Sequence, residues 1–176
     1  MLYTGKGDNG TTKTFGCGQR MSKSSAIAEA LGALDEVNSF LGVVKVNPRA
    51  TEIVETIAIV QQNLFIVQAE VAGADKRIAE KKVREVEAVI NAVEAELPPI
   101  KSFFVSGGTE LAAMLDFART LARRAERRVV GVAEERKTTV GKETLAYLNR
   151  LSSLLYVLAR HANYKSGITE EPPTYQ

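Results

Sequence analysis

A repeat of apolar residues between positions 111 and 132 constrains the fold of this chain more than any other feature. The repeat alternates spacings of four and three residues through Leu111, Leu115, Ala118, Ala122, Ala125, Val129 and Val132. Because an α-helix turns by about 100° per residue, these side chains form one stripe on a single face. The pattern predicts a long helix whose apolar stripe packs against other helices.

Four further segments show a helical period. They cover about residues 25–45, 51–72, 83–97 and 142–164, and prolines break the chain at Asn47-Pro48 and at Leu97-Pro98-Pro99. Ser24 or Ser25 is expected to cap the first helix, and Ser106 or Thr109 the fourth. No segment shows a convincing strand pattern. We therefore predict an all-α fold, namely an up-and-down five-helix bundle.

Length and composition exclude several classes of protein. We expect one domain over residues 1–176, with an N-terminal loop at 1–25, a helical bundle at 26–166 and a flexible tail at 167–176. The formal net charge of +2 is too small to favour nucleic acid, and no apolar run is long enough for a membrane span. The N-terminus does not resemble a signal peptide, and the single cysteine, Cys17, fits a reducing cytoplasm. The single histidine, His161, has no partner spaced to share a metal ion.

Charged residues form a second stripe beside the apolar one on the predicted fourth helix. Arg119, Arg123 and Glu126 lie on this stripe, whereas Arg124 and Arg128 point elsewhere. Two guanidinium groups one turn apart can hold a polyanion in a bidentate manner, and the carboxylate can orient them. The alternative is a solvated helix face with ordinary salt bridges.

The first 25 residues are rich in glycine and threonine. Gly5, Gly7 and Gly10 match a G-x-G-x-x-G spacing, but no buried strand precedes them, so we reject a dinucleotide-binding fingerprint. A Walker lysine followed by serine or threonine is also missing. Such a loop can still place backbone N–H groups against phosphates. Hydroxyl and ammonium groups stand close by in the sequence, on Thr4, Lys6, Thr11, Thr12 and Lys23. The alternative is a flexible N-terminal tail.

Four other residues are candidates for a ligand site. Phe103 and Phe104 are adjacent on the linker before the fourth helix, where large apolar side chains need a cover; the alternative is that both plug the end of the bundle. Asp35 lies on a helix stripe of small residues and carboxylates and could pair with an arginine. Asn149 lies on a polar stripe of the last helix, where a plain surface role is the alternative.

Taken together, these motifs resemble the PduO-type ATP:cob(I)alamin adenosyltransferases, a cobalamin adenosyltransferase family. The resemblance covers nearly the whole chain, and the order of the motifs argues against a chance match. The matching stretches are Tyr3-Thr4 with Gly7-Asp8-Asn9-Gly10-Thr11-Thr12, Phe15-Gly16 with Ser22-Lys23, Glu29-Ala30-Leu31-Gly32 with Asp35-Glu36-Val37-Asn38-Ser39, Phe103 with Gly107-Gly108, Ala118-Arg119-Thr120 through Arg123-Arg124-Ala125-Glu126-Arg127, and Tyr147-Leu148-Asn149-Arg150-Leu151-Ser152.

The resemblance implies an enzyme that transfers the 5′-deoxyadenosyl group of ATP to the cobalt of cob(I)alamin and releases triphosphate. It also implies a homotrimer in which ATP, with Mg²⁺ on its phosphates, is held at subunit interfaces under the N-terminal loop. No residue is predicted as a metal ligand, and a cobalamin reductase or a B12-dependent enzyme is a candidate protein partner. Because cobalt(I) is itself the nucleophile, the protein needs only a triphosphate clamp and an apolar wall that excludes water.

The resemblance assigns roles to individual residues. Arg119 and Arg123 would act on the leaving group, and Asp35 would pair with Arg119 across the interface. Phe103 would lie beneath the corrin ring and displace the lower axial ligand, although the residues alone leave open whether Phe104 does so. The predicted cofactor-binding residues are Thr4, Gly5, Lys6, Gly7, Thr11, Thr12, Lys23, Arg119, Arg123, Arg124, Glu126, Arg127 and Asn149. At Gly5 the family usually has lysine or arginine, so this phosphate contact is missing or has moved to Lys6.

Two other functions remain open from the residues. A helical bundle could bind nucleotide or corrinoid as a carrier without any reaction. Alternatively, the arginine stripe could dock an acidic protein partner, although a docking helix has no use for a loop of glycine and threonine. The hypothesis of nucleic-acid binding has still less support, because glutamates interrupt the basic stretch and no aromatic stacking platform accompanies it.

Overall fold

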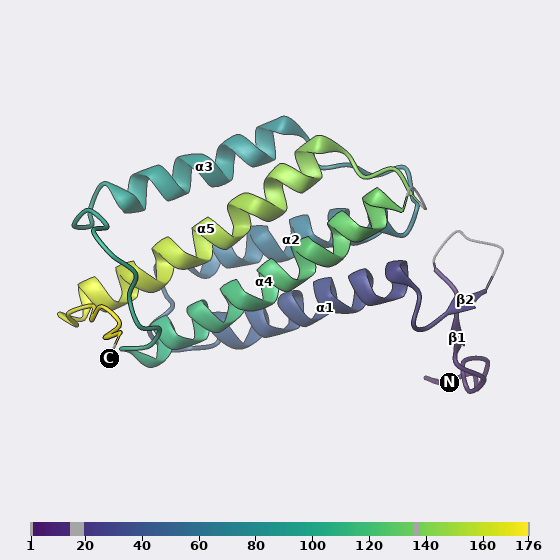
Figure 1. The fold of residues 1–176 in the computed structure, drawn as a ribbon, viewed down its shortest axis with the longest axis horizontal. Coiled ribbons are helices and arrows are strands. Elements are labelled where there is room, and N and C mark those ends of the chain that lie inside the picture. The colour runs from purple at the N-terminus through teal and green to yellow at the C-terminus, as the bar shows by residue number, and fades with distance from the viewer. Residues whose placement is uncertain (1, 15–19, 136–137, 176) are drawn as a thin grey trace.

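The computed structural model describes residues 2–14, 20–135 and 138–175, and their main body is a bundle of five long helices (Figure 1). The helices are α1 (Ala26–Lys45), α2 (Val54–Val71), α3 (Glu80–Glu94), α4 (Glu110–Glu134) and α5 (Lys142–Lys165). Consecutive helices run in opposite directions along the bundle (Figure 1). Helix α4 packs against both α1 and α5, while α2 packs on α1 and α3 packs on α5. The predicted fold class is therefore confirmed.

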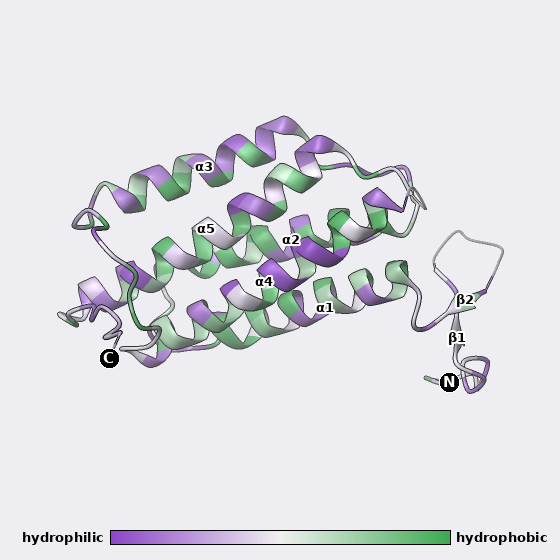
Figure 2. Ribbon diagram, viewed as in Figure 1, coloured by the Kyte–Doolittle hydropathy of each residue, from purple (hydrophilic) through white to green (hydrophobic). Residues whose placement is uncertain are grey.

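The apolar repeat on α4 forms the centre of the core, as predicted. All seven of its side chains are buried, with at most 5% of their surface exposed. Apolar residues of the other helices meet this stripe, and green and purple bands alternate along the helices in Figure 2. No described helix is both long enough and apolar enough to cross a membrane.

The helix ends follow the predictions at two of the caps and differ at others. Ser25 accepts a hydrogen bond from the backbone N–H of Ala28, and Thr109 accepts one from the N–H of Ala112. Helix α2 begins at Val54 rather than near residue 51, because residues 50–53 form a tight turn first. Helix α3 runs from Glu80 to Glu94, whereas about residues 83–97 were predicted. It ends early because the residues before the prolines form a tighter turn with hydrogen bonds between residues three apart.

A buried carboxylate caps the last helix. Glu70 at the end of α2 is only 1% exposed, and it accepts hydrogen bonds from the N–H of Gly141 (2.7 Å) and from the hydroxyl of Thr144. Arg77 donates to the same carboxylate at 2.7 Å. A negative charge at the N-terminus of α5 is favourable because unpaired N–H groups point towards it. Glu70 therefore joins α2 to α5, a contact that the sequence pattern did not predict.

We expect Glu70→Ala to lower the free energy of unfolding by about 2–4 kcal/mol, because it leaves buried donors without an acceptor. Urea unfolding followed by circular dichroism measures this loss. Glu85→Ala is the control: the Glu85 side chain is 51% exposed and pairs loosely with Lys81. The control should change stability by less than about 0.5 kcal/mol. Equal unfolding midpoints for the two variants would contradict the capping role of Glu70.

The N-terminal segment contains a small sheet that we did not predict. Strand β1 (Thr11–Thr12) pairs in antiparallel fashion with β2 (Met21–Ser22), and each strand has only two residues. Such short strands carry no period that a sequence pattern can show. The hairpin extends beyond the end of the bundle at which α1 begins, at the right of Figure 1. Phe15, Gly16 and Cys17, which entered the sequence analysis, lie outside the described residues.

Candidate functional site

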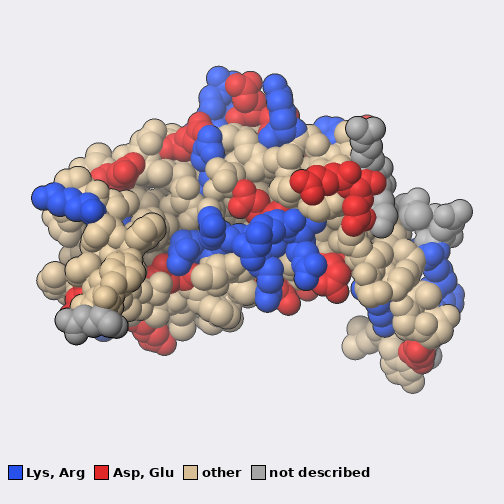
Figure 3. Space-filling model, in the orientation of Figure 1, with Lys and Arg blue, Asp and Glu red and all other residues tan. Residues whose placement is uncertain are grey.

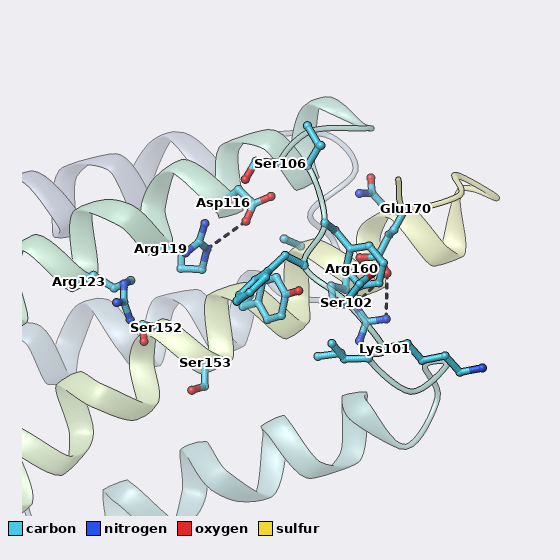
Figure 4. A pocket seen from close by; sticks show the side chains of 17 residues that line it. Lys101, Ser102, Ser106, Asp116, Arg119, Arg123, Ser152, Ser153, Arg160 and Glu170 are labelled. Atoms are coloured by element: carbon cyan, nitrogen blue, oxygen red, sulfur yellow. Dashed lines mark hydrogen bonds and ion pairs between the residues drawn. The ribbon is translucent and has the colours of Figure 1, made fainter. Parts of the chain in front are cut away.

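An open groove of about 760 Å³ lies between α4, α5 and the linker that joins α3 to α4 (Figure 4). Helix α4 contributes Arg119 and Arg123, and α5 contributes Ser153 and Tyr156. The linker contributes Phe103 among its apolar side chains. The groove therefore combines two cations with an apolar wall, which suits a large ligand with an anionic end and an apolar face.

Arg119 is held in place by its neighbours in the groove. Its side chain is 25% exposed, and its Nε donates to Oδ1 of Asp116 at 3.1 Å (Figure 4). Its guanidinium carbon also lies 5.8 Å from the ring centre of Tyr156. A guanidinium group over an aromatic face keeps its planar donors directed along the groove. Arg123 lies one turn further along α4 and is exposed, so the predicted pair of arginines does share one surface.

Asp116 and Tyr156 are groove residues whose roles the sequence analysis missed. Burial raises the pKa of the Tyr156 hydroxyl above its usual value, so this group stays neutral at physiological pH. Tyr156 stands on the polar stripe of the last helix that also contains Asn149, and that stripe was the available signal. Asp116 precedes Arg119 by three residues, a spacing that brings side chains together on a helix.

The two adjacent phenylalanines have different environments. Both rings line the groove, but Phe103 is 81% exposed, whereas Phe104 is partly buried and lies against Arg160. The interpretation that both rings plug the end of the bundle is therefore wrong for Phe103. An exposed ring beside two arginines is available to a ligand.

Two of the other cations of α4 face α1. Arg124 forms a short ion pair with Glu36, and Arg128 lies 3.7 Å from Glu29. This agrees with the prediction that Arg124 and Arg128 point away from the stripe of Arg119, although Arg124 was also predicted to bind ATP. Arg127 is exposed. Figure 3 shows Lys and Arg gathered across the middle of the face along which α4 runs in Figure 1. The surface is therefore basic beyond the two groove arginines.

Glu126 and Asn149 are brought together, but not in the predicted way. The Asn149 amide donates to Oε1 of Glu126 at 3.1 Å and accepts from Arg150 at 2.7 Å. We had expected the Glu126 carboxylate to orient Arg119 and Arg123. Among the described residues, Asp116 fills that role for Arg119.

Asp35 lies on α1 with its side chain exposed and makes no hydrogen bond or ion pair to another described residue. Within one chain Arg119 pairs with Asp116 instead, as described above. The predicted Asp35–Arg119 pair was assigned to a subunit interface, and a single chain does not test it.

The N-terminal loop brings several predicted phosphate contacts together. Gly5 and Gly10 have positive φ angles of 67° and 77°, which turn the chain tightly between residues 5 and 10. The Lys23 ammonium lies over Gly7, so closely that a Cβ there would be 3.2 Å from Nζ. Lys23 is also joined to Gly10 through a backbone hydrogen bond of 2.9 Å. The loop thus folds back on itself and brings the Lys23 ammonium against Gly7.

Threonines and an arginine complete and brace this loop. The Thr4 hydroxyl accepts a hydrogen bond from the N–H of Lys6, and Thr12 lines a second hollow together with Lys23. Arg20 donates to the hydroxyl of Thr11 at 2.7 Å and also to the carbonyls of Lys6 and Thr11. This bracing role of Arg20 was missed, because a single arginine in a loop gives no pattern.

Within one chain, the loop and the groove lie apart. The hairpin extends from the end of the bundle where α1 begins, whereas the linker that walls the groove lies near the C-terminus at the other end (Figure 1). The described loop residues 4–14 and 20–23 therefore do not join the arginine pair of their own chain.

The fold and groove define a helical bundle with a candidate site whose lining combines two arginines with apolar side chains. Comparison with known proteins gives the particular family. Residues 2–162 match the family model described as cobalamin adenosyltransferase, and the chain belongs to this family.

Relatives and solved structures agree with this assignment. The chain is 40% identical to corrinoid adenosyltransferase PduO of Citrobacter freundii, over 97% of this chain and 53% of that protein. It is 36% identical to the corrinoid adenosyltransferase of Bacillus subtilis, over 95% of this chain and 89% of that protein. The chain thus spans about half the length of the PduO relatives that it matches.

A solved structure of a variant PduO-type ATP:corrinoid adenosyltransferase from Lactobacillus reuteri, complexed with cobalamin and ATP, superposes with a TM-score of 0.90. It shares 30% sequence identity, and the alignment covers 98% of this chain and 99% of that one. The bundle described above is therefore the fold of this family.

Proposed function

We propose that this chain transfers the 5′-deoxyadenosyl group of ATP to the cobalt of a reduced corrinoid. The electron pair of cobalt(I) attacks C5′, the C5′–O bond breaks, and triphosphate leaves with that bonding pair. The observation that carries the proposal is the groove in which Arg119 and Arg123 stand beside the exposed ring of Phe103. Membership of the family supports the same reaction.

The arginines would act on the leaving group. Negative charge increases on the triphosphate as the C5′–O bond breaks, and guanidinium groups aimed at this charge stabilise the transition state. Arg119 is already oriented by Asp116 and Tyr156, so little reorganisation is needed when the ligand binds. Arg123 is exposed and free to reach a phosphate. Arg124, Arg127, Glu126 and Asn149 would complete the ATP site around this pair.

Phe103 would form the apolar wall on the corrin side. A corrin ring lying on this side chain would lose water, or a nitrogen ligand, from the lower face of its cobalt. An unligated lower face would favour the reduced metal as nucleophile. Phe103 rather than Phe104 would form most of this wall, because Phe103 is 81% exposed whereas Phe104 is partly buried against Arg160.

The N-terminal loop would close over the nucleotide phosphates with its backbone amides. Residues Thr4, Gly5, Lys6, Gly7, Thr11, Thr12 and Lys23 would make these contacts. Among the described residues no cluster of His, Cys, Asp and Glu could hold a metal ion. Mg²⁺ would be carried by the phosphates of ATP, because Mg²⁺ in such sites is often bound chiefly by the substrate. The ion would supply charge neutralisation on the triphosphate.

The separation of loop and groove within one chain supports a site shared between subunits. In the proposed homotrimer, the loop of one chain would cover the arginine pair of its neighbour. Asp35 on α1 of the chain that supplies the loop would then approach Arg119 of the neighbour, and the exposed position of Asp35 is compatible with this.

The test of the function is to supply ATP and chemically reduced cobalamin together. We expect equal amounts of adenosylcobalamin, followed by its absorbance, and of triphosphate. Binding of ATP and corrinoid without release of triphosphate would favour the carrier alternative instead. If the protein neither binds ATP and corrinoid nor releases triphosphate, only the docking alternative remains.

We expect Phe103→Ala to slow the adenosylation of cobalamin by about 10²-fold, because small misplacements at the reacting centre have effects of this size. ATP affinity should remain within about two-fold, since Phe103 lies on the apolar side of the groove. Steady-state kinetics with cobalamin and isothermal titration with ATP measure the two effects.

Phe65→Ala is the matched control for this variant. Phe65 on α2 is also exposed, at 58%, and does not line the groove. If Phe103→Ala only lowered thermal stability and left the turnover of folded protein intact, Phe103 would be a packing residue.

A further inference from the structure

Arg160 on α5 is a buried cation whose polar partners all lie outside the helices. Its side chain is 4% exposed, and its Nε lies 3.0 Å from both carboxylate oxygens of Glu170 (Figure 4). It also donates to the carbonyl of Pro98 at 3.1 Å. Burying a charge is unfavourable unless it is paired, so this geometry ties the tail and the linker firmly to α5.

The same guanidinium group sets the orientation of Phe104. Its carbon lies 5.3 Å from the ring centre of Phe104, within the range of a cation–π contact. Phe104 is thereby turned towards α5. The preceding residue, Phe103, is 81% exposed in the groove.

The tail also contacts the linker directly. The N–H of Val105 donates to the carbonyl of Glu171 at 2.9 Å. Residues 168–175 form no helix or strand, yet they are attached at two neighbouring positions: Glu170 to α5 and Glu171 to the linker. The middle of the linker is therefore held between α5 and the tail.

A different residue holds the far end of the linker. Asn163 donates to the carbonyl of Gly107 at 2.8 Å and accepts from the N–H of Thr109 at 2.9 Å. These bonds do not involve the tail. The Arg160–Glu170 pair is thus a separate support for the part of the linker that bears Phe103.

We infer that Arg160 and Glu170 are positioning residues for the corrin side of the site. Their ion pair holds the tail against α5, and Arg160 also holds the ring of Phe104. The backbone at Phe104 then orients the neighbouring side chain of Phe103 into the groove. The inference rests on the proposed function, because it gives the exposed ring of Phe103 its role. It makes the tail a part of the site, since Glu170 lines the groove and also holds the linker through Arg160.

The test compares Glu170→Ala with Glu171→Ala. Glu171 is exposed and contributes only its backbone carbonyl, so its substitution changes the same tail without touching the ion pair. Hydrogen exchange in peptides from residues 98–109 should become about ten-fold faster in Glu170→Ala and stay unchanged in Glu171→Ala. The KM for cobalamin should rise about ten-fold in Glu170→Ala, with ATP affinity unchanged. Glu170→Asp, which keeps the charge, should recover most of both properties.

The outcomes separate this inference from the proposed function. If the unaltered protein forms no adenosylcobalamin, the proposed function fails, while the exchange data still decide whether the ion pair holds the linker. If the protein is active and the Ala variants at 170 and 171 behave alike, the inference is wrong. Equal losses of ATP and cobalamin affinity would also overturn it, because they would indicate general destabilisation. If Glu170→Ala does not fold, Glu170→Gln is measured by the same criteria.

Discussion

Arg123→Ala should lower kcat/KM for ATP by about 30- to 1,000-fold, which corresponds to about 2–4 kcal/mol of transition-state stabilisation. The reason is the loss of a charged donor at the triphosphate. Thermal stability should hardly change, because Arg123 is exposed and forms no ion pair within the described part of the chain. Steady-state kinetics and a thermal melt on the same preparation measure the two quantities.

Arg84→Ala is the control for this experiment. Arg84 on α3 is also an exposed arginine, with 68% of its side chain accessible, and it pairs only with Glu80. Its removal should leave kinetics unchanged, because an exposed pair contributes little. Unchanged kinetics in Arg123→Ala as well would remove Arg123 from the site and leave the basic surface of α4 without a catalytic role.

Deleting residues 1–23 should abolish measurable ATP binding while the helical circular dichroism remains almost intact. The loop carries the backbone amides and the Lys23 ammonium that we assign to the phosphates, yet it contributes little to the core. Isothermal titration with ATP measures the loss. If affinity survives the deletion, the loop is not part of the nucleotide site.

Mixing two inactive variants tests the placement of the loop across subunits. When the loop-deleted chain and the Arg123→Ala chain are co-expressed, some mixed assemblies will combine an intact loop with an intact arginine pair on neighbouring chains. Adenosyltransferase activity should therefore return in the mixture. No recovery would indicate that loop and arginines must belong to one chain, and the interfacial site would then be wrong.

The helices could be predicted because their apolar stripes are long and regular. The stripe from Leu111 to Val132 is buried over its full length, and the capping residues Ser25 and Thr109 follow from simple side-chain chemistry. The boundaries of α2 and α3 were less predictable. At their ends a short turn and a further turn of helix differ by only a single hydrogen bond, so either can form. The small sheet was not predictable at all, because two-residue strands have no period.

The site was predictable where it lies on a helix. The spacing of Arg119 and Arg123 places both on one face, and the structure brings them into one groove. Contacts between elements distant in sequence could not be derived in this way. The observed partner of Arg119 is Asp116, not the predicted Glu126. The Arg160–Glu170 pair joins a helix to a tail whose sequence has no regular pattern.

The side-chain amide of Asn163 limits which residues can stand at position 108 of the linker. Gly108 has a φ of +96°, and a Cβ there would lie 2.3 Å from Oδ1 of Asn163. Since Asn163 also bonds Thr109, the cap of α4, this one side chain sets where α4 starts relative to α5. A larger residue at position 108 would displace the Asn163 amide, and the N–H of Thr109 and the carbonyl of Gly107 would then lose their partner.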